Sequence, residues 1–192
     1  EYVGRYDLDE AGLRDFHEER FALLADSGAD LLACETLPSR VEARLLLRLL
    51  DETPGARAWF SFTARDADHI SDGTPLAEMA RELDHERVVG IGVNCVPPAL
   101  VAGLLGELAH ATDHPLVAYP NSGETWNASA RAWEGVPRGS RPEEACVAWR
   151  DAGARFIGGC CRVGPVAIAH LRRHLCSPGG ASRPTRPPSP RA

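Results

Sequence analysis

Three cysteines at the ends of two short apolar runs are the residues of this chain best suited to chemistry. Cys160 and Cys161 are adjacent and follow two glycines after the run 154–157, and Cys95 closes the apolar run 88–93. Adjacent cysteines pair with each other only under strain, because disulfide geometry fits poorly across one peptide bond. Their thiolates can instead bind one soft metal ion together. The pattern predicts a three-thiolate Zn²⁺ site with an open fourth position, which is typical of catalytic zinc.

A zinc ion with three thiolate ligands carries a net negative charge and suits a particular kind of reaction. A substrate thiol in the fourth position would lose its proton, because metal coordination lowers the pKa of a thiol from its ordinary value. Its sulfur would stay a good nucleophile, since the electron-rich ion polarises it only weakly. The expected chemistry is attack by this sulfur on an electrophilic carbon.

The elements that must position these cysteines alternate between helix and strand. Short apolar runs predict strands, at residues 30–34, 58–63, 88–93, 116–119 and 155–159. Amphipathic segments predict helices between them, at residues 7–27, 39–50, 74–83, 98–110, 141–152 and 164–175. Repeated strand–helix units of this kind indicate a parallel sheet covered by helices, which is an α/β fold.

Two helix starts are read from capping boxes, in which side chains satisfy the first backbone N–H groups of a helix. The boxes are at residues 7–10 and 39–42. The first helix is expected to bury one apolar face, made by Leu13, Phe16, Leu23 and Leu24.

Two architectures fit the repeated units, a doubly wound sheet and a (β/α)8 TIM barrel. The sequence has no GxGxxG or Walker A motif, which counts against a nucleotide-binding sheet. Polar residues and cysteines follow the strand ends, where a barrel gathers its active site. We therefore favour the (β/α)8 barrel, although the sequence shows about five of its eight βα units.

The residues that follow each predicted strand make up the candidate site. Besides the cysteines they are Glu35, Thr36, Asn94, Asn121, Ser122 and Gly123. A carboxylate such as Glu35 can bind a substrate ammonium group through a charge-assisted hydrogen bond. Backbone amides around Ser122 and Gly123 can bind a carboxylate. Structural interpretations stay open, since Glu35 can cap the next helix and Asn121 and Ser122 are common turn residues.

Composition sets limits on the partners of the chain. The 192 residues carry a net charge of −6, which argues against nucleic acid as a partner. No apolar run approaches the roughly 20 residues that span a bilayer. No signal peptide is visible, although the chain starts at Glu1 without methionine. We expect a cytoplasmic protein with reduced cysteines, in which Cys146 and Cys176 pack on helices. A disulfide-bonded secreted domain is the alternative.

Two segments fall outside the regular pattern. Residues 121–140 predict a long loop with Trp126 and Trp133, and loops of this length are usually functional or mobile. Residues 177–192 are mostly Pro, Ser, Gly and Arg, which predicts a disordered tail after one folded domain at residues 1–176.

Taken together, these motifs resemble the homocysteine S-methyltransferase family. They are Glu35-Thr36, Gly92-Val93-Asn94-Cys95, Tyr119-Pro120-Asn121-Ser122-Gly123-Glu124 and Gly158-Gly159-Cys160-Cys161-Arg162. The likeness runs from Glu1 to about Leu175 and is greatest to the branch that uses S-methylmethionine. Betaine–homocysteine methyltransferase and the homocysteine module of methionine synthase are similar too.

The resemblance implies a (β/α)8 barrel that holds Zn²⁺ through Cys95, Cys160 and Cys161 and binds the amino group of homocysteine at Glu35. It implies methyl transfer from a sulfonium donor, S-methylmethionine or S-adenosylmethionine, to L-homocysteine, which forms methionine. The small-molecule substrates would be its only implied partners. The alternative is a truncated, non-catalytic zinc- or thiol-binding remnant of such an enzyme.

The chain departs from the family in its length. Family members carry roughly three further βα units before this point, including a glycine-rich first strand that lines the homocysteine pocket. We therefore expect the 192-residue chain to have unpaired strand edges, to be marginally stable, and to show little activity without an upstream extension.

Overall fold

The computed structural model describes residues 2–135 and 142–176. The predicted tail at 177–192 and the last part of the predicted loop, 136–140, lie outside the described residues. Within the described ranges the helices are α1 (Glu10–Ala25), α2 (Arg40–Glu52), α3 (Leu76–Glu82), α4 (Pro98–Ala111), α5 (Pro142–Asp151) and α6 (Pro165–Cys176). The strands are β1 (Leu32–Leu37), β2 (Ala58–Phe62), β3 (Val88–Asn94), β4 (Leu116–Tyr119), β5 (Thr125–Asn127), β6 (Ala132–Glu134) and β7 (Ala154–Ile157).

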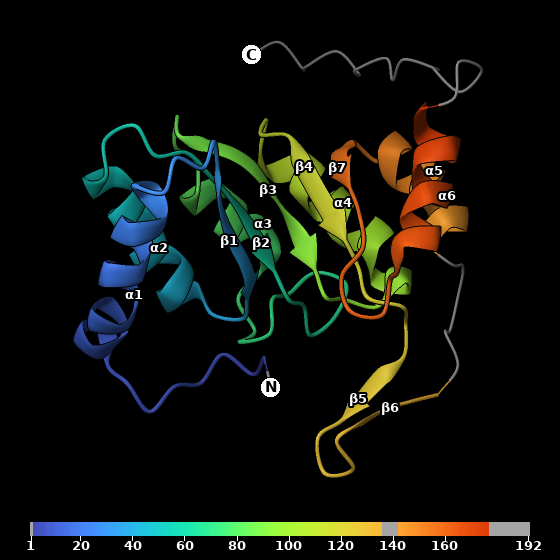
Figure 1. Ribbon diagram of the computed structural model, residues 1–192, viewed down its shortest axis with the longest axis horizontal. Helices are drawn as coiled ribbons and strands as arrows, with labels where there is room; N and C mark the ends of the chain where they lie inside the picture. The colour runs from blue at the N-terminus through green and yellow to red at the C-terminus, as the bar shows by residue number, and fades with distance from the viewer. Residues whose placement is uncertain (1, 136–141, 177–192) are drawn as a thin grey trace.

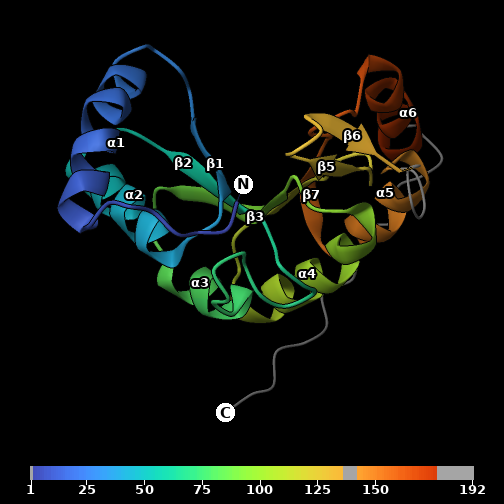
Figure 2. The same cartoon turned by 90° about the horizontal axis from the view of Figure 1, so that it is seen from below.

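Five of these strands form one parallel sheet whose order follows the chain, β1-β2-β3-β4-β7 (Figure 1). Seen from below, the sheet is curved, and the helices lie along its convex side (Figure 2). A doubly wound sheet would reverse its strand order and place helices on both faces. The expected α/β fold with a parallel sheet is therefore confirmed, and the doubly wound alternative is excluded.

The core lies between the sheet and the helices on its convex side. Apolar side chains of the central strands alternate toward the helices, as the pleat of a strand requires. The largest fully buried side chains include Phe60, Phe62 and Ile91 of the strands and Leu104, Leu105 and Trp149 of the helices. The other side of the strands is concave and carries the polar side chains described below.

Helix α1 differs from its prediction in both its start and its buried face. It begins at Glu10, after the N-cap Asp9, whose carboxylate accepts a hydrogen bond from the Gly12 amide. The helix buries Leu13, His17 and Phe21, which are spaced four residues apart. Three of the four residues predicted for the buried face are exposed, namely Phe16, Leu23 and Leu24. A buried histidine with polar partners takes their place, which apolar periodicity alone does not find.

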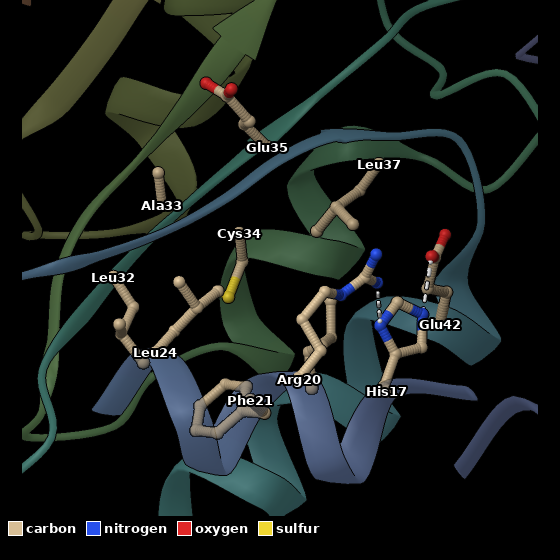
Figure 3. Close-up of a pocket in the computed structure, with 11 residues that line it drawn as sticks. His17, Arg20, Phe21, Leu24, Leu32, Ala33, Cys34, Glu35, Leu37 and Glu42 are labelled. Atoms are coloured by element: carbon tan, nitrogen blue, oxygen red, sulfur yellow. Dashed lines mark hydrogen bonds and ion pairs between the residues drawn. The ribbon is translucent and has the colours of Figure 1, made fainter. Parts of the chain in front are cut away.

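The buried His17 fixes α1 to α2 through partly buried polar contacts (Figure 3). Its Nε2 lies 2.9 Å from a carboxylate oxygen of Glu42, and the Arg20 guanidinium lies 2.8 Å from its Nδ1. The Tyr6 hydroxyl donates to the other carboxylate oxygen of Glu42. The polar groups are thus satisfied in a place where an unpaired one would cost stability.

The start of α2 is capped by a residue from another loop. Ser39 makes no side-chain capping bond, so the predicted capping box at 39–42 is wrong. The Asp72 carboxylate instead accepts from the Arg40 amide at 2.7 Å and from the Thr74 amide at 2.8 Å. A carboxylate at this end also matches the positive end of the helix dipole.

Two further differences concern the ends of strands. β1 continues to Leu37, so Glu35 and Thr36 lie within the strand, where its register with β2 shifts. The predicted loop at 121–140 contains an antiparallel hairpin, in which the ring of Trp126 packs on that of Trp133 with 5.5 Å between centroids. None of the helices in the described ranges combines the length and apolar content that crossing a membrane requires.

Gly92 allows the close approach of β3 to β4, and we predict that Gly92→Ala strongly destabilises the fold. A Cβ on this glycine would lie 1.8 Å from the Val117 carbonyl oxygen. Because the obstacle is backbone, the free energy of unfolding should fall by about 3 kcal/mol or more. Urea unfolding followed by circular dichroism measures this change.

The matched control is Gly106→Ala on α4, where no atom lies within 4 Å of the added Cβ. Helix propensity predicts that this variant gains roughly 0.5–1 kcal/mol. Equal unfolding midpoints for Gly92→Ala and the parent would contradict the proposed packing.

Candidate metal and amino-acid site

The three predicted cysteines converge at the carboxyl ends of β3 and β7. The sulfur atoms of Cys95, Cys160 and Cys161 all lie within 4.8 Å of one another. The Sγ atoms of Cys95 and Cys161 are 3.5 Å apart. All three residues are partly exposed. The convergence is what binding one ion by three thiolates requires, and it brings together residues 65 positions apart in the sequence.

Cys95 and Cys160 are joined as a disulfide, with their Cα atoms 5.6 Å apart. The expectation of six reduced cysteines is therefore wrong for this pair in the structure. The physical reason is the convergence itself, because sulfurs directed at one point lie within bonding reach of each other. Cys161 keeps a free thiol beside the pair.

The backbone around the cysteines is held in unusual conformations. Cys95 has a φ of 52° and Arg162 a φ of 64°, which non-glycine residues rarely adopt. The Cys95 amide donates to the Tyr119 carbonyl at 3.2 Å, and the Cys160 amide donates to the Pro120 carbonyl at 2.8 Å. These bonds tie the turns after β3 and β7 to the end of β4, the strand between them.

Gly159 has a steric role directly before the cysteine pair. A Cβ at this position would lie 2.2 Å from a methyl carbon of Val163. The chain turns back here tightly, since the Val163 amide donates to the Cys160 carbonyl at 3.1 Å. The glycine thus permits the turn that presents both sulfurs toward Cys95.

Glu35 lies on the concave face and is exposed, at the predicted place beside the end of β1. Figure 3 shows its side chain pointing away from α1, opposite to those of Cys34 and Leu37. The Tyr119 hydroxyl donates to its carboxylate at 2.9 Å. That bond orients the carboxylate and leaves its other oxygen available to a ligand.

Tyr119 belongs to a polar network that the sequence did not reveal. Its hydroxyl accepts from the Trp59 indole at 3.2 Å and lies 2.5 Å from the Ser61 hydroxyl. Burial raises the pKa of Tyr119 above its ordinary value, so the hydroxyl stays protonated as a donor to Glu35. The available signal was Ser61, a serine between two phenylalanines in an otherwise apolar strand.

Asn94, the last residue of β3, lies next to Thr36 of β1. Asn94 is fully buried and exchanges two hydrogen bonds with Thr36, at 2.8 and 2.7 Å. The Asn94 side-chain amide nitrogen also lies 3.9 Å from the Cys160 sulfur. The two predicted residues are therefore brought together with the three converging cysteines.

Asn121, Ser122 and Gly123 follow β4 and are engaged with their own surroundings. The Ser122 amide donates to the Cys161 carbonyl at 3.1 Å, and the Gly123 amide donates to the Asn121 side-chain oxygen at 2.8 Å. The Asn121 amide nitrogen donates to the Cys95 carbonyl at 3.3 Å. The backbone amide hydrogens of Ser122 and Gly123 therefore both have partners within the protein. Carboxylate binding by these amides stays a prediction.

Arg162 and Glu124 join the cysteine turn to the start of the β5–β6 hairpin. The guanidinium forms two bonds with the carboxylate, at 2.7 and 3.1 Å, and the Ser122 hydroxyl donates to the same carboxylate at 2.7 Å. The guanidinium and this hydroxyl lower the pKa of Glu124, so the carboxylate stays ionised at neutral pH. The contact holds the two loops of the site together.

Two cavities open beside these residues. One of about 460 Å³ lies on the concave face, lined by Trp59, Tyr119, Gly158 and Gly159 among others. Another of about 360 Å³ lies between residues 2–6 and the end of β1, and Glu35 and Thr36 line it. Their volumes suit ligands of amino-acid size.

The other cysteines are separate from this site. Cys34 points toward α1, and burial raises the pKa of its thiol to about 12. Cys146 is buried on α5, and Cys176 is exposed on α6. High pKa and burial make Cys34 unreactive. Cys146 is buried as predicted, whereas Cys176, also predicted to pack, is exposed.

Comparison with known proteins identifies the family. The family model described as homocysteine S-methyltransferase matches residues 1–175. This chain belongs to the homocysteine S-methyltransferase family. The predicted resemblance is thereby confirmed over the range on which it was based.

Several curated relatives in this family are similar over most of the chain. "Homocysteine S-methyltransferase" from Escherichia coli (strain K12) is 44% identical over 180 residues, which cover 90% of this chain and 56% of the relative. "Homocysteine S-methyltransferase YbgG" from Bacillus subtilis (strain 168) is 42% identical over 172 residues, which cover 89% of this chain and 55% of the relative. The chain thus spans about half the length of the curated relatives it matches.

The fold also matches a solved structure, the metallated form of the homocysteine methyltransferase MmuM from Escherichia coli. The TM-score is 0.76 at 42% sequence identity, over 89% of this chain and 54% of that one. An oxidised form of the same protein matches with the same TM-score. Similarity of sequence and similarity of fold therefore cover a similar share of the relatives.

Proposed function

We propose that this chain is the zinc- and homocysteine-binding part of an enzyme that moves a methyl group from a sulfonium donor to L-homocysteine and so forms methionine. The observation that carries the proposal is the convergence of three sulfurs at the carboxyl ends of β3 and β7. Membership of the homocysteine S-methyltransferase family supports the choice of acceptor. The small molecules would be its partners, and the cytoplasm its place of action.

The three sulfurs fit Zn²⁺ by number and type, and the Cys95–Cys161 pair fits it by spacing. Zinc–sulfur bonds of about 2.3 Å in a tetrahedron put the sulfurs roughly 3.8 Å apart. The Cys95–Cys161 separation of 3.5 Å is close to this value. Cys95 and Cys160 must be reduced before they bind an ion, because a disulfide sulfur is not a thiolate. Zinc binding should therefore depend on reductant.

The reaction exchanges one carbon–sulfur bond for another. The homocysteine thiol loses its proton, its sulfur attacks the methyl carbon, and the donor sulfur leaves with the bonding electron pair as a neutral thioether. Zn²⁺ held by Cys95, Cys160 and Cys161 would supply the positive charge that favours the deprotonated thiol. No oxidant or reductant is needed, because the methyl group leaves its bonding electron pair on the donor sulfur and accepts a pair from the homocysteine sulfur. The thiol proton goes to solvent.

The chain's own residues have the task of placing homocysteine. The Glu35 carboxylate would bind the ammonium group by a charge-assisted hydrogen bond. Tyr119 keeps that carboxylate in place through its 2.9 Å hydrogen bond. Homocysteine would thus be held at both of its ends, with its ammonium group at β1 and its thiol directed toward the cysteines at β3 and β7. Such orientation lowers the barrier to attack.

We infer that the curved sheet is five of the eight βα units of a TIM barrel, within a domain at residues 1–176. Strands in chain order with helices on one convex side support this, as does the match to about half of each relative. A barrel places its active site at the carboxyl ends of its strands, where the three cysteines converge. The rival proposal is a zinc- or thiol-binding remnant that keeps the metal and not the reaction.

We predict that the reduced protein binds one Zn²⁺ and that Cys161→Ala weakens this binding at least tenfold, because one of three thiolates is lost. Metal analysis and competition with a chelator measure it. Cys176→Ala, which removes an exposed free thiol on α6, is the control and should bind zinc like the parent. A parent that binds no zinc, or a Cys161→Ala variant that keeps full affinity, contradicts the site.

We predict that Glu35→Ala leaves zinc binding intact and weakens homocysteine binding. A hydrogen bond to a charged group contributes about 1.5–3 kcal/mol, which is roughly ten- to hundredfold in affinity. Calorimetric titration of the zinc-loaded protein with homocysteine measures the change. Glu107→Ala on the exposed side of α4 removes a carboxylate far from the site and serves as control. Unchanged affinity would assign Glu35 a structural role only.

A panel of methyl donors with homocysteine as acceptor decides between the enzyme and the remnant. We expect S-methylmethionine to be the best donor, followed by S-adenosylmethionine and then betaine. The 192-residue chain should show little turnover, and a form extended upstream by the further βα units should be active, because the added strands complete the barrel. Methionine formation by mass spectrometry is the measurement. An extended form that binds zinc and transfers no methyl group supports the remnant.

A further inference from the structure

Asn94 is the buried polar residue that connects the two halves of the candidate site. It ends β3 directly before Cys95, and its side chain has no exposed surface. Its oxygen accepts from the Thr36 amide at 2.8 Å and from the Ser61 hydroxyl at 2.9 Å. Its nitrogen donates to the Thr36 hydroxyl at 2.7 Å and lies 3.9 Å from the Cys160 sulfur.

These contacts fix which way the amide of Asn94 points. The Thr36 backbone N–H can only donate, so the atom facing it must be the side-chain oxygen. The nitrogen then necessarily faces the Thr36 hydroxyl and Cys160. Both hydrogens of the Asn94 side-chain nitrogen and both lone pairs of its oxygen have partners, so the side chain has no capacity left to bind a substrate group. Asn94 is thus placed to support the site and not to contact substrate.

Two residues in contact with Asn94 have a strained backbone, namely its hydrogen-bond partner Thr36 and the next residue in the chain, Cys95. Thr36 has a φ of 61°, a rare value for a residue branched at Cβ, and Cys95 has a φ of 52°. Such conformations persist only where surrounding bonds hold them. The two bonds between Asn94 and Thr36 hold the first, and the hydrogen bond from the Cys95 amide to the Tyr119 carbonyl holds the second.

We propose that Asn94 is a positioning residue that donates an N–H hydrogen bond to the Cys160 thiolate and thereby couples the metal-binding sulfurs to the Glu35–Thr36 end of β1. Three thiolates around one ion repel each other and carry excess negative charge. An N–H donor aimed at one of them disperses that charge and fixes the direction of the sulfur. The inference rests on the proposed function, because it assigns a partner to the thiolates that bind Zn²⁺.

The test compares variants that remove different contacts of the same amide. Asn94→Asp keeps the oxygen that accepts from Thr36 and Ser61 and replaces the nitrogen that faces Cys160. Ser61→Ala removes one bond of the amide and leaves that nitrogen in place, so it is the matched control. Zinc affinity of the reduced proteins is measured by competition with a chelator. Loading the reduced proteins with Co²⁺ gives a second readout, which is the absorption band of the thiolate-to-metal charge-transfer transition.

Asn94→Asp should bind zinc about ten- to hundredfold more weakly, the typical loss when a hydrogen-bond partner of a metal ligand is removed. Its cobalt–thiolate band should move to lower energy, because the sulfur becomes more electron-rich. Ser61→Ala should stay within about threefold of the parent and keep the band position. Equal affinities and equal spectra for Asn94→Asp and Ser61→Ala would overturn the inference.

A measurement without any variant covers the case in which Asn94→Asp does not fold. In ¹⁵N-labelled protein the side-chain amide proton of Asn94 should shift downfield when reduced protein is loaded with Cd²⁺. An unshifted resonance would overturn the inference, while zinc or cadmium binding itself would still support the proposed function. A parent that binds neither metal would instead reject the proposed function. The two failures are therefore distinguishable.

Discussion

The register between β3, β4 and β7 is the constraint on which the candidate site depends. Asn94 pairs with Tyr119, and Ala118 pairs with Ile157, so the three strands end side by side. Because side chains alternate between the faces of a strand, a shift of one residue would turn every side chain of that strand to the opposite face. The amides of Cys95 and Cys160 bond to carbonyls at the end of β4, which continues the register into both turns. The convergence of the three sulfurs therefore follows from the register of the strands in the sheet.

A continuous set of polar contacts extends from that edge across the concave face. Glu35 bonds to Tyr119, Tyr119 contacts Ser61, and Ser61 bonds to Asn94, which faces Cys160. Each of these groups is partnered, and the hydrogen bonds of the buried Ser61 and Asn94 lie in a low-dielectric environment, where such bonds are strong and directional. The network keeps a carboxylate and a cluster of sulfurs in fixed positions relative to each other. That arrangement suits a substrate with an ammonium group at one end and a thiol at the other.

The elements that the sequence predicted well are those with clear periodicity. All five strands of the sheet and all six helices occur within a few residues of their predicted ranges, because short apolar runs and amphipathic spacing are local properties. The cysteines and Glu35 could be placed at one edge because parallel strands share their direction. Adjacent cysteines after a strand, together with a third after another strand, were sufficient to predict that three sulfurs converge.

Features that depend on distant partners could not be predicted in this way. Asp72 caps α2 from another loop, and a capping box at residues 39–42 has the same local sequence whether or not it is used. His17 is buried because Glu42 lies within 2.9 Å of it, a contact between helices α1 and α2. Burial and full hydrogen bonding of Asn94 depend on partners from two other strands, Thr36 of β1 and Ser61 of β2, so spacing along the sequence could not predict them.

The two edges of the curved sheet account for how metal binding and catalysis can be separated. β1 and β7 are the outer strands of the described sheet. A cavity of about 260 Å³ lies between β1 and α1 (Figure 3), where Leu24 is exposed, and Phe156 of β7 is 53% exposed at the other edge. Closing a barrel would add strands between these two edges and cover both apolar surfaces. The sulfurs and Glu35 all come from elements of the described sheet, so the proposed metal and ammonium contacts would need no added strand. An enclosed cavity that excludes water from a reacting sulfur would need such strands, so the proposed catalysis would depend on closure more than the proposed metal binding would.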